Sequence, residues 1–508
     1  MISTLTPTSD RLQQLQTWVT EIHDIYAAAA LLYWDRATYM PSQGVAARGR
    51  QMALLRQIAH QKMTDDRLGE LLANLRSQAG DFAPHSAEAS LIEVADRNYQ
   101  RAVQVPSEFV ARFSRHRTDC YDAWARAKED DNFAIVQPKL EKTLELTQEY
   151  ASYFSGYDHI ADPLIEDVDY GMTVATLRPL FSQLRQELVP IVEAIAACPA
   201  PDTSCLQQTF DRQQQLDFTL DLLQQLGYDF SRGRQDESLH PFTTSFSIDD
   251  VRITTRVRED DLTEALFSSI HEMGHALYEQ GFDRQLEGTP LAEGSSSGVH
   301  ESQSRLWENL VGRSHQFWKY FYPQLQQKFP QQLADVSLDT FYRAVNNVER
   351  SLIRTDADEV TYNLHVMIRF DLELELLEGS LAVRDLPEAW NARYESDLGV
   401  RPPSDRLGVL QDIHWYTSNI GAMFQCYTLG NLMSAQLYDA VLKADPNLLE
   451  NIAAGNFASL HRWLIDNVHQ FGCRYTPSEL IVKATGAELS IAPFLNYIRG
   501  KYSQLYDI

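Results

Sequence analysis

Cysteine is scarce in this chain. The five cysteines are spread singly among 508 residues, their number is odd, and no two of them form a CxxC pair. This usage argues against a disulfide framework and against a structural zinc–thiolate site, and it favours a reducing compartment. We therefore expect a cytoplasmic protein.

Positive charge and long apolar stretches are also lacking. The chain has 44 Lys and Arg against 70 Asp and Glu, and the resulting net charge of -26 argues against nucleic acids and anionic membranes as partners. No apolar run approaches the length of a membrane span. The N-terminus has no basic start followed by an apolar stretch, so it does not resemble a signal peptide.

Helical periodicity dominates what is present. Apolar residues recur at spacings of three and four in long segments, namely 10–33, 87–156, 172–196, 205–227, 303–328, 340–378 and 430–444. Strands are expected at 243–248 and 251–257, because both stretches are rich in β-branched residues and flank a turn. The predicted fold class is mainly α, a large helical body with a deep groove and a small sheet.

No break in the chain is long enough for a domain linker. We therefore expect a single domain over 1–508. Within it we distinguish an N-terminal helical part at about 1–235, a catalytic core at about 236–430 and C-terminal helices at 431–508.

The most informative motif is HEMGH at 271–275. Apolar residues around it recur at helical spacing, so His271 and His275 lie one turn apart on one face of a helix and can reach a single metal ion. Glu272 is then placed to take a proton from a metal-bound water. Gly281 follows the last apolar turn and is a plausible end of this helix.

A third metal ligand is expected on the next helix. A Gly- and Ser-rich loop follows the first helix, a second helical pattern begins near Val299, and Glu301 stands thirty positions after His271. Three protein ligands would leave the fourth tetrahedral position for water, as in catalytic zinc sites. Taken alone, Glu301 is more typical of a solvated helix acid, and its position after a helix and a loop is what favours a ligand role. Glu308, seven residues further on, is one candidate partner for orienting the histidines.

Three more segments carry polar side chains in patterns that admit two interpretations. Asp250, Arg252 and Thr254 alternate along a predicted strand, so their side chains share one face. This face is either exposed, with an ion pair between Asp250 and Arg252, or part of a functional site. The charged segment 353–359 lies within an otherwise apolar helix pattern. It is either a solvated face of that helix or the wall of a polar cleft. His414 follows a break in the chain and is free to point at a ligand, although a capping or core role is equally compatible.

Taken together, these segments resemble the carboxypeptidase Taq family of zinc metallocarboxypeptidases. The matching motifs occur in the family's order: HPF at 240–242, DVRIT at 250–254, HEMGH at 271–275, HESQS at 300–304, IRTDADEVTY at 353–362 and GVLQDIHW at 408–415. Two further segments, LLYWDRATYMP at 31–41 and YTLGN at 427–431, extend the resemblance over the whole chain.

The resemblance implies an almost wholly helical fold with a small sheet beside a deep groove, and assembly as a homodimer. It implies removal of single C-terminal residues from short peptides with broad side-chain tolerance. His271, His275 and Glu301 would hold one Zn2+ per chain, with Co2+ or Mn2+ as possible substitutes. Glu272 would be the general base.

The resemblance also implies roles around the substrate. Arg354 would bind the terminal carboxylate, a task suited to the two-pronged guanidinium. The DVRIT and GVLQDIHW segments would close one end of the groove through Arg252 and His414, and His240 is expected to contact substrate. His414 and Tyr427 are our candidates for stabilising the oxyanion.

Two other functions share some of these features. A helical zinc endo-oligopeptidase or dipeptidyl carboxypeptidase has the same HExxH–Glu layout. A catalytically silent scaffold could keep the zinc for stability, but such a site needs no base beside its ligands and usually has four protein ligands. The intact Glu272 argues against this scaffold.

Overall fold

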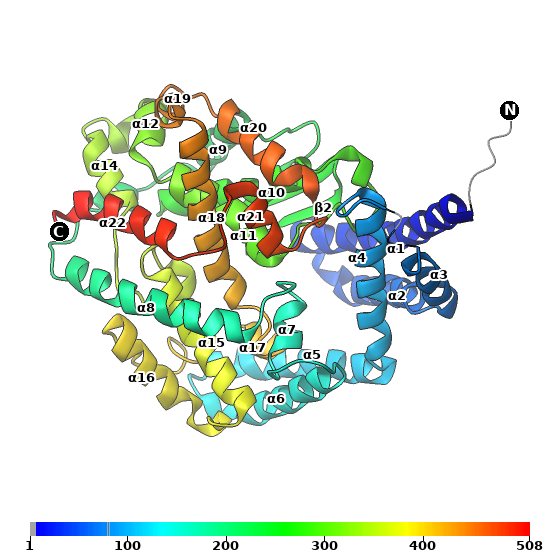
Figure 1. Ribbon diagram of the computed structural model, residues 1–508. Coiled ribbons are helices and arrows are strands. Elements are labelled where there is room, and N and C mark those ends of the chain that lie inside the picture. The colour runs from blue at the N-terminus through cyan, green and yellow to red at the C-terminus, as the bar shows by residue number, and fades with distance from the viewer. Residues whose placement is uncertain (1–6, 79, 81) are drawn as a thin grey trace, which may run out of the picture.

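Helices form most of the chain, and within the described residues the strands are confined to a short stretch before the HEMGH segment (Figure 1). The computed structural model describes residues 7–78, 80 and 82–508. The predicted fold class is confirmed: a mainly helical body carries a small sheet against one of its central helices. Within the described residues, no helix is both long and apolar enough to cross a membrane.

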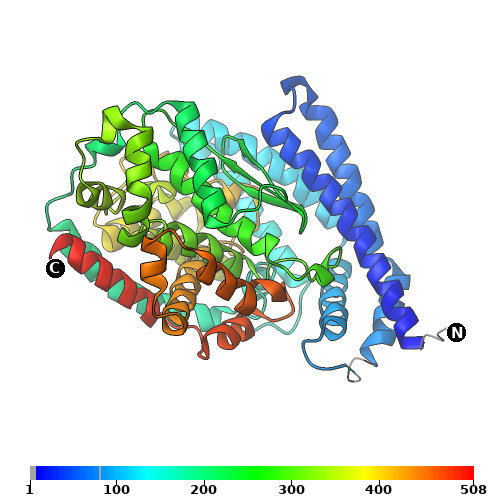
Figure 2. The same cartoon turned by 90° about the horizontal axis from the view of Figure 1, so that it is seen from above.

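The first third of the chain is a series of helices, and α1 and α2 run side by side at one edge of the molecule (Figure 2). The predicted single helical segment at 87–156 is three helices. Pro106 caps the start of the second, and Asp131, with a left-handed φ of 51°, follows its end. The helices are α1 (Pro7–Thr38), α2 (Val45–Met63), α3 (Asp66–Arg76), α4 (Ala87–Gln104), α5 (Ser107–Glu129), α6 (Gln137–Ser152), α7 (Asp162–Glu166), α8 (Val174–Ala196) and α9 (Arg212–Leu226).

The sheet has three strands in the order β1-β3-β2: β1 (Gln235–Glu237), β2 (Thr243–Ser247) and β3 (Asp250–Thr255). The antiparallel pair β2 and β3 is the predicted hairpin. The parallel strand β1 was missed, because three polar residues carry no strand signal. Since Thr243 pairs with Ile253, these two side chains lie on the same face of the sheet. This face packs on the helix that carries HEMGH.

The central helices follow the sheet and include the HEMGH helix, which ends at Gly281 as expected. Two predicted helical segments are interrupted. Residues 303–328 break at 312–314, and residues 340–378 break at 346–361, where the Asp358 carboxylate accepts backbone N–H groups at the start of the next helix. The elements are α10 (Leu262–Gln280), α11 (Ser297–Arg305), the π-helical turn η6 (Leu306–Val311), α12 (His315–Lys328), α13 (Pro330–Leu333), α14 (Leu338–Val345), α15 (Tyr362–Glu378), α16 (Leu386–Leu398) and α17 (His414–Thr417).

The last helices cover the centre of the molecule. They are α18 (Gln425–Ala444), α19 (Leu448–Ala453), α20 (Ala458–Asn467), α21 (Pro477–Thr485) and α22 (Ala492–Tyr506). Helix α18 packs closely on α11. A Cβ at Gly430 would lie 2.6 Å from the Cβ of Glu301, so glycine is required where the two helices meet.

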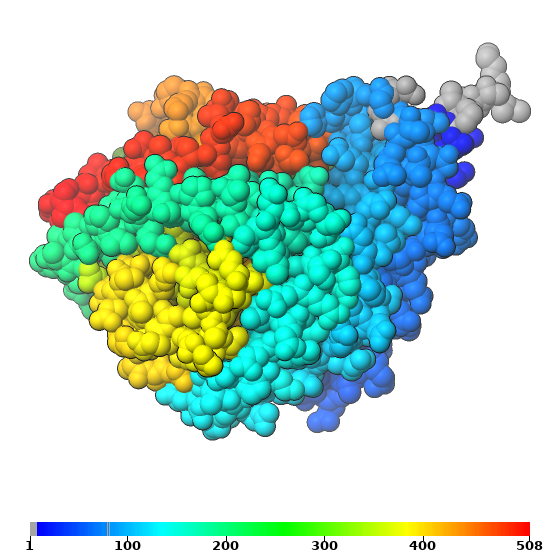
Figure 3. All heavy atoms as spheres, turned by 60° about the horizontal axis from the view of Figure 1, so that its bottom comes forward, coloured from blue at the N-terminus to red at the C-terminus, as the bar shows by residue number. Residues whose placement is uncertain are grey.

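The apolar core runs through all of these parts. Its largest cluster of buried side chains extends from Leu15 in α1 to Leu505 in α22. In the space-filling view the N-terminal helices form one flank of the surface, and α16 lies on the other side of the same face (Figure 3). Helices α10, α11 and α18 are the framework on which the site is built, because each is largely buried.

Candidate active site

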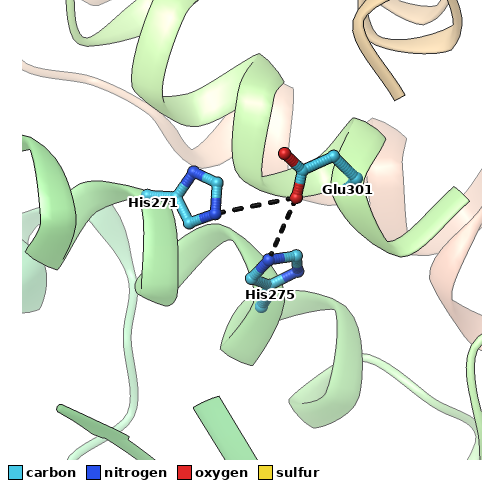
Figure 4. Close-up of side chains that lie close together, drawn as sticks. All are labelled: His271, His275 and Glu301. Atoms are coloured by element: carbon cyan, nitrogen blue, oxygen red, sulfur yellow. Dashed lines mark ion pairs between the residues drawn. The ribbon is translucent and has the colours of Figure 1, made fainter. Parts of the chain in front are cut away.

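The three predicted metal ligands come together between α10 and α11 (Figure 4). The Nε2 atoms of His271 and His275 lie 3.6 and 3.5 Å from Oε2 of Glu301. One ligand atom from each residue falls within 4.8 Å of the others. Two imidazoles and one carboxylate around a shared point are a donor set that fits a divalent transition metal with a position left open.

Local sequence explains why both helices begin where they do. The Asp261 carboxylate accepts the N–H of Thr263 at the start of α10. The Ser296 hydroxyl accepts the N–H of Val299 at the start of α11. These side chains satisfy backbone donors that have no partner within the helix, and they fix where each ligand-bearing turn begins.

A second layer of side chains holds the ligands. Oε2 of Glu308, the partner considered from the sequence, lies 2.9 Å from Nδ1 of His271. Nδ1 of His275 contacts Nδ1 of His300 at 2.6 Å, and Nε2 of His300 lies 2.6 Å from Glu279. Such contacts leave Nε2 of each ligating histidine free for a metal. His300 and Glu279 were missed, although His300 stands directly before Glu301 in the sequence.

Arg305 bridges the two buried carboxylates of this cluster. Its Nε donates to Oε1 of Glu301 at 2.7 Å, and a terminal nitrogen donates to Oε2 of Glu308 at 2.9 Å. Burial opposes ionisation of Glu301, but Arg305 and the two histidines outweigh it and hold the pKa of this carboxyl well below its usual range. Burial lowers the pKa of His275 to about 3, which keeps this imidazole neutral, the form that binds metals.

Glu272 is buried beside the ligands, with 7% of its surface exposed. The hydroxyl of Thr243 on β2 lies 2.6 Å from Oε2 of Glu272 and 2.9 Å from its backbone oxygen, so it can orient the carboxylate. Burial raises the pKa of Glu272 above its ordinary value. A carboxylate of raised pKa next to a metal site is suited to accepting and returning a proton.

Arg354 lies on a short 3₁₀ turn between α14 and α15. The sequence predicted a continuous helix here, so the turn is a correction. Of the two interpretations left open for this charged segment, burial favours a polar wall at Arg354, whose exposed fraction is 6%. Its guanidinium donates to Asp412 at 2.8 Å and to the hydroxyl of Tyr362 at 3.0 Å. The fully buried Arg369 also pairs with Asp412. Two guanidiniums thus share one carboxylate.

His414 and Tyr427 lie next to this cluster. The Tyr427 hydroxyl is 3.4 Å from Nε2 of His414, and the Tyr427 ring centre is 5.2 Å from the Arg354 guanidinium carbon. Nδ1 of His414 lies 3.7 Å from Asp412. Tyr427 also lines the same cavity as His275 and Glu301, so it connects the Arg354 cluster to the metal ligands.

Arg252 and His240 are placed differently. Arg252 pairs with Asp250 on its own strand at 2.8 Å and lies 4.4 Å from the ring centre of Trp34 on α1. Successive side chains of a strand point to opposite faces, so Arg252 lies on the face opposite to Ile253 and α10. His240 is exposed. The structure does not bring these two side chains into contact with the three ligands, within the described residues.

A cavity of about 860 Å³ opens beside the ligands. His275, Glu301 and Tyr427 form one part of its wall. Helix α4, the end of α7 with the segment after it, the loop before α11, and single residues of α1, α2 and the segment before α21 also line it. A volume of this size accommodates a short peptide.

Comparison with known proteins decides the family. The sequence model described as Carboxypeptidase Taq (M32) metallopeptidase matches residues 14–502. The chain belongs to this M32 family. Carboxypeptidase 1 of Bacillus subtilis is 38% identical over 484 residues, covering 94% of this chain and 95% of that protein. Thermostable carboxypeptidase 1 of Thermus thermophilus is 39% identical over 504 residues, covering 97% and 98%.

Solved structures agree with this assignment. The M32 carboxypeptidase from Deinococcus radiodurans R1 superposes with a TM-score of 0.96 at 48% identity, covering 98% of this chain and all of that one. M32 membership confirms the family inferred from the sequence motifs, and it makes this chain a metallocarboxypeptidase, a hydrolase of peptides. The family also implies a divalent metal, for which His271, His275 and Glu301 are the fitting group.

Proposed function

We propose that this M32 protein is a zinc carboxypeptidase that removes single C-terminal residues from short peptides and tolerates many side chains at the cleaved position. The observation that carries the proposal is the proximity of two clusters of opposite character. Tyr362 lies between them: its ring centre is 4.4 Å from the Arg305 guanidinium carbon, and its hydroxyl accepts from Arg354. One cluster suits a metal cation and the other suits a carboxylate.

His271, His275 and Glu301 would hold one zinc ion, and cobalt or manganese are substitutes that the same donors accept. When bound, the metal supplies a Lewis acid that polarises the scissile carbonyl and makes water a nucleophile near neutral pH. Arg305 supports monodentate binding by Glu301, because it occupies the second carboxylate oxygen.

Glu272 would take the proton from the attacking water and pass it to the leaving amine. Its burial supports both steps, since a raised pKa makes the carboxylate a better base and its conjugate acid available near neutral pH. Thr243 would keep one oxygen of Glu272 fixed while the other faces the water. Glu272 alone would then carry out both proton transfers at the metal-ligand cluster.

Arg354 would bind the terminal carboxylate of the peptide. Arg354 and Arg369 carry two positive charges, and the single carboxylate of Asp412 neutralises one of them. An excess positive charge in a buried place is costly until an anion arrives. The substrate carboxylate can supply that anion, and this preference is what separates an exopeptidase from an endopeptidase.

The Tyr427 hydroxyl and the His414 imidazole are our proposed donors to the oxyanion of the tetrahedral intermediate. They stand between the Arg354 cluster and the cavity wall formed by the ligands. A well-placed donor of this kind contributes about 3 to 4 kcal/mol to stabilisation of the transition state.

We also propose that the DVRIT and GVLQDIHW segments close one end of the groove through Arg252 and His414 and so limit substrate length, and that His240 contacts the substrate. Arg252 is held rigidly between Asp250 and the Trp34 ring, which supports a role as a fixed barrier. Homodimeric assembly rests on the family resemblance. A cytoplasmic location rests on the cysteine usage.

The proposal is tested with a short N-blocked peptide, followed by mass spectrometry of the products. Wild type should release single C-terminal residues in sequence and should require a free acid, so the C-terminal amide of the same peptide should resist cleavage. Glu272→Gln should retain its metal and lose activity by a factor of about 10²–10⁴, the usual contribution of a general base.

Three results would contradict the proposal in different ways. Internal cleavage or release of dipeptides would indicate an oligopeptidase or a dipeptidyl carboxypeptidase. Metal bound without cleavage of any peptide would indicate a silent scaffold. Equal activity of wild type and Glu272→Gln, each with its metal content measured, would remove Glu272 from the mechanism.

A further inference from the structure

The cavity continues well beyond the metal ligands. From His275 it follows α10 to Glu279 and reaches Glu293 on the loop before α11. The Arg354 cluster lies on the Tyr427 side of the ligands. If the peptide carboxylate sits at Arg354, as proposed above, the residues before the scissile bond must extend into this other part, which we call the upstream groove.

The upstream groove carries more acids than bases. Four carboxylates line it against two guanidiniums: Glu166, Asp167, Glu279 and Glu293 against Arg97 and Arg101. Most of these groups are already paired. Arg101 pairs with Asp167 and, at 3.7 Å, with Glu166, and Glu279 lies 2.6 Å from His300.

Glu293 and Arg97 are the two exceptions. Among the residues that the structure describes, Glu293 has no hydrogen-bond or ion-pair partner, and Arg97 has no ion-pair partner. Arg97 is held on α4 with its guanidinium carbon 4.1 Å from the Tyr170 ring centre. The Glu293 side chain is exposed on the groove wall; burial of its carboxylate and the charge of Glu279 raise its pKa to about 7, and the charge of Arg97 acts in the opposite direction.

The position of Glu279 along α10 gives the scale. It is one turn beyond His275, which corresponds to about 6 Å at a rise of about 1.5 Å per residue. An extended peptide advances about 3.3 Å per residue. The acidic part of the groove therefore begins about two residues before the scissile bond.

We propose that Glu293 is a specificity residue that binds a positive charge at this point of the substrate. Two sources have the required ammonium or guanidinium chemistry: the free α-amino group of a tripeptide or tetrapeptide, and a Lys or Arg side chain in a longer peptide. The charge of Arg97 favours the ionised form of Glu293, which is the form that binds a cation. This inference rests on the proposed function, because it uses the orientation set by Arg354.

The experiment compares kcat/KM for matched peptides. In the first pair one sequence of four residues has either a free or an acetylated N-terminus. In the second pair both longer peptides are acetylated, and the third residue before the scissile bond is Lys or norleucine. The enzymes are wild type, Glu293→Gln and the control Glu193→Gln, which makes the same change at an exposed acid on α8 outside the cavity lining.

Wild type and the control should prefer the charged member of at least one pair by roughly five- to tenfold, mainly through KM, as expected for a partly exposed ion pair in a groove. Glu293→Gln should remove this preference and leave the uncharged peptides unaffected. The pair that responds identifies the source of the charge. Added salt should reduce the wild-type preference.

The inference is overturned if Glu293→Gln lowers activity on charged and uncharged peptides equally, or if wild type shows no charge preference in either pair. Metal content and thermal unfolding of each variant show whether an equal loss comes from a damaged fold. Failure of the proposed function has a different signature: wild type would release no single C-terminal residue from any of the four peptides, and both proposals would then fall.

Discussion

The metal-ligand cluster and the Arg354 cluster are neighbours across Tyr362, but they are built in opposite ways. The ligands stand on two regular helices, and three carboxylates there face two guanidiniums: Glu272, Glu301 and Glu308 against Arg305 and Arg313. The Arg354 cluster is assembled from a turn, a helix and a loop and has two guanidiniums around one carboxylate.

This difference explains how one groove could bind both a metal cation and the terminal carboxylate of a peptide. A surplus of carboxylate favours a cation, and a surplus of guanidinium favours an anion. Tyr362 separates the carboxylate-rich metal-ligand cluster from the guanidinium-rich Arg354 cluster, because its ring packs on Arg305 and its hydroxyl accepts a hydrogen bond from Arg354. The peptide bond that lies between a metal and a bound carboxylate is the last bond of the chain.

Removing one of the two guanidiniums of the Arg354 cluster should have the largest effect on activity. Arg354→Gln should lower kcat/KM on free-acid peptides by about a thousandfold, since removal of one partner of a buried charge pair costs about 2 to 5 kcal/mol. Zinc content should be unchanged, because Arg354 does not contact the ligands. Kinetics on a free acid and metal analysis of the same preparation measure both.

A matched control separates the missing cation from damage to the fold. Arg406→Gln changes an arginine that bonds to backbone oxygens of Lys128 and Glu129 on the exposed surface, and it should leave kcat/KM unchanged. Full activity of Arg354→Gln on the free acid would disprove the assignment of the terminal carboxylate to this residue.

Changing the metal side should have a smaller effect and a different readout. Glu308→Gln removes the carboxylate that faces Nδ1 of His271. Metal affinity should fall by about 10- to 100-fold, the usual cost of losing an outer partner of a ligand. Competition with a chelator measures this affinity. With saturating zinc, the KM for free-acid peptides should stay near that of wild type, and a large rise in KM would mean that the two clusters are not separate.

The metal side was largely predictable from sequence. Helical periodicity links His271 to His275, and separately Glu301 to Glu308, because such spacing determines which side chains share a face before any tertiary contact forms. What periodicity could not supply was the contact between His275 and His300, since it depends on how α10 and α11 cross.

The Arg354 side was predicted as a polar segment, but its contacts were not. Arg354, Arg369 and Asp412 meet from a turn, a helix and a loop, and Asp412 is 58 residues from Arg354 and 43 from Arg369 in sequence. The expected helix over 340–378 fails at 346–361 because the carboxylate of Asp358 caps α15 and stops the helix from extending backwards. Family resemblance, rather than local pattern, indicated Arg354.

The last prediction concerns Glu373, a second acid near this positive cluster, and its readout is stability rather than activity. Glu373 is buried, accepts from Nε1 of Trp415 at 2.7 Å, and has its pKa raised to about 8 by burial. The folded protein therefore holds a proton on Glu373 that the unfolded chain releases at a much lower pH. Protonated Glu373 leaves the excess charge of Arg354 and Arg369 uncancelled near neutral pH.

The sign of the stability effect follows from this raised pKa. As pH rises from about 5 toward about 8, wild type should lose stability because of Glu373 by up to about 1.4 kcal/mol per pH unit, the value for one proton. Glu373→Gln should lack this contribution, so its unfolding free energy relative to wild type should rise with pH and level off above about 8. Denaturant unfolding of both proteins at several pH values measures the difference, and parallel curves would mean that Glu373 is already ionised in the folded protein and that the charge surplus at Arg354 is smaller than the geometry implies.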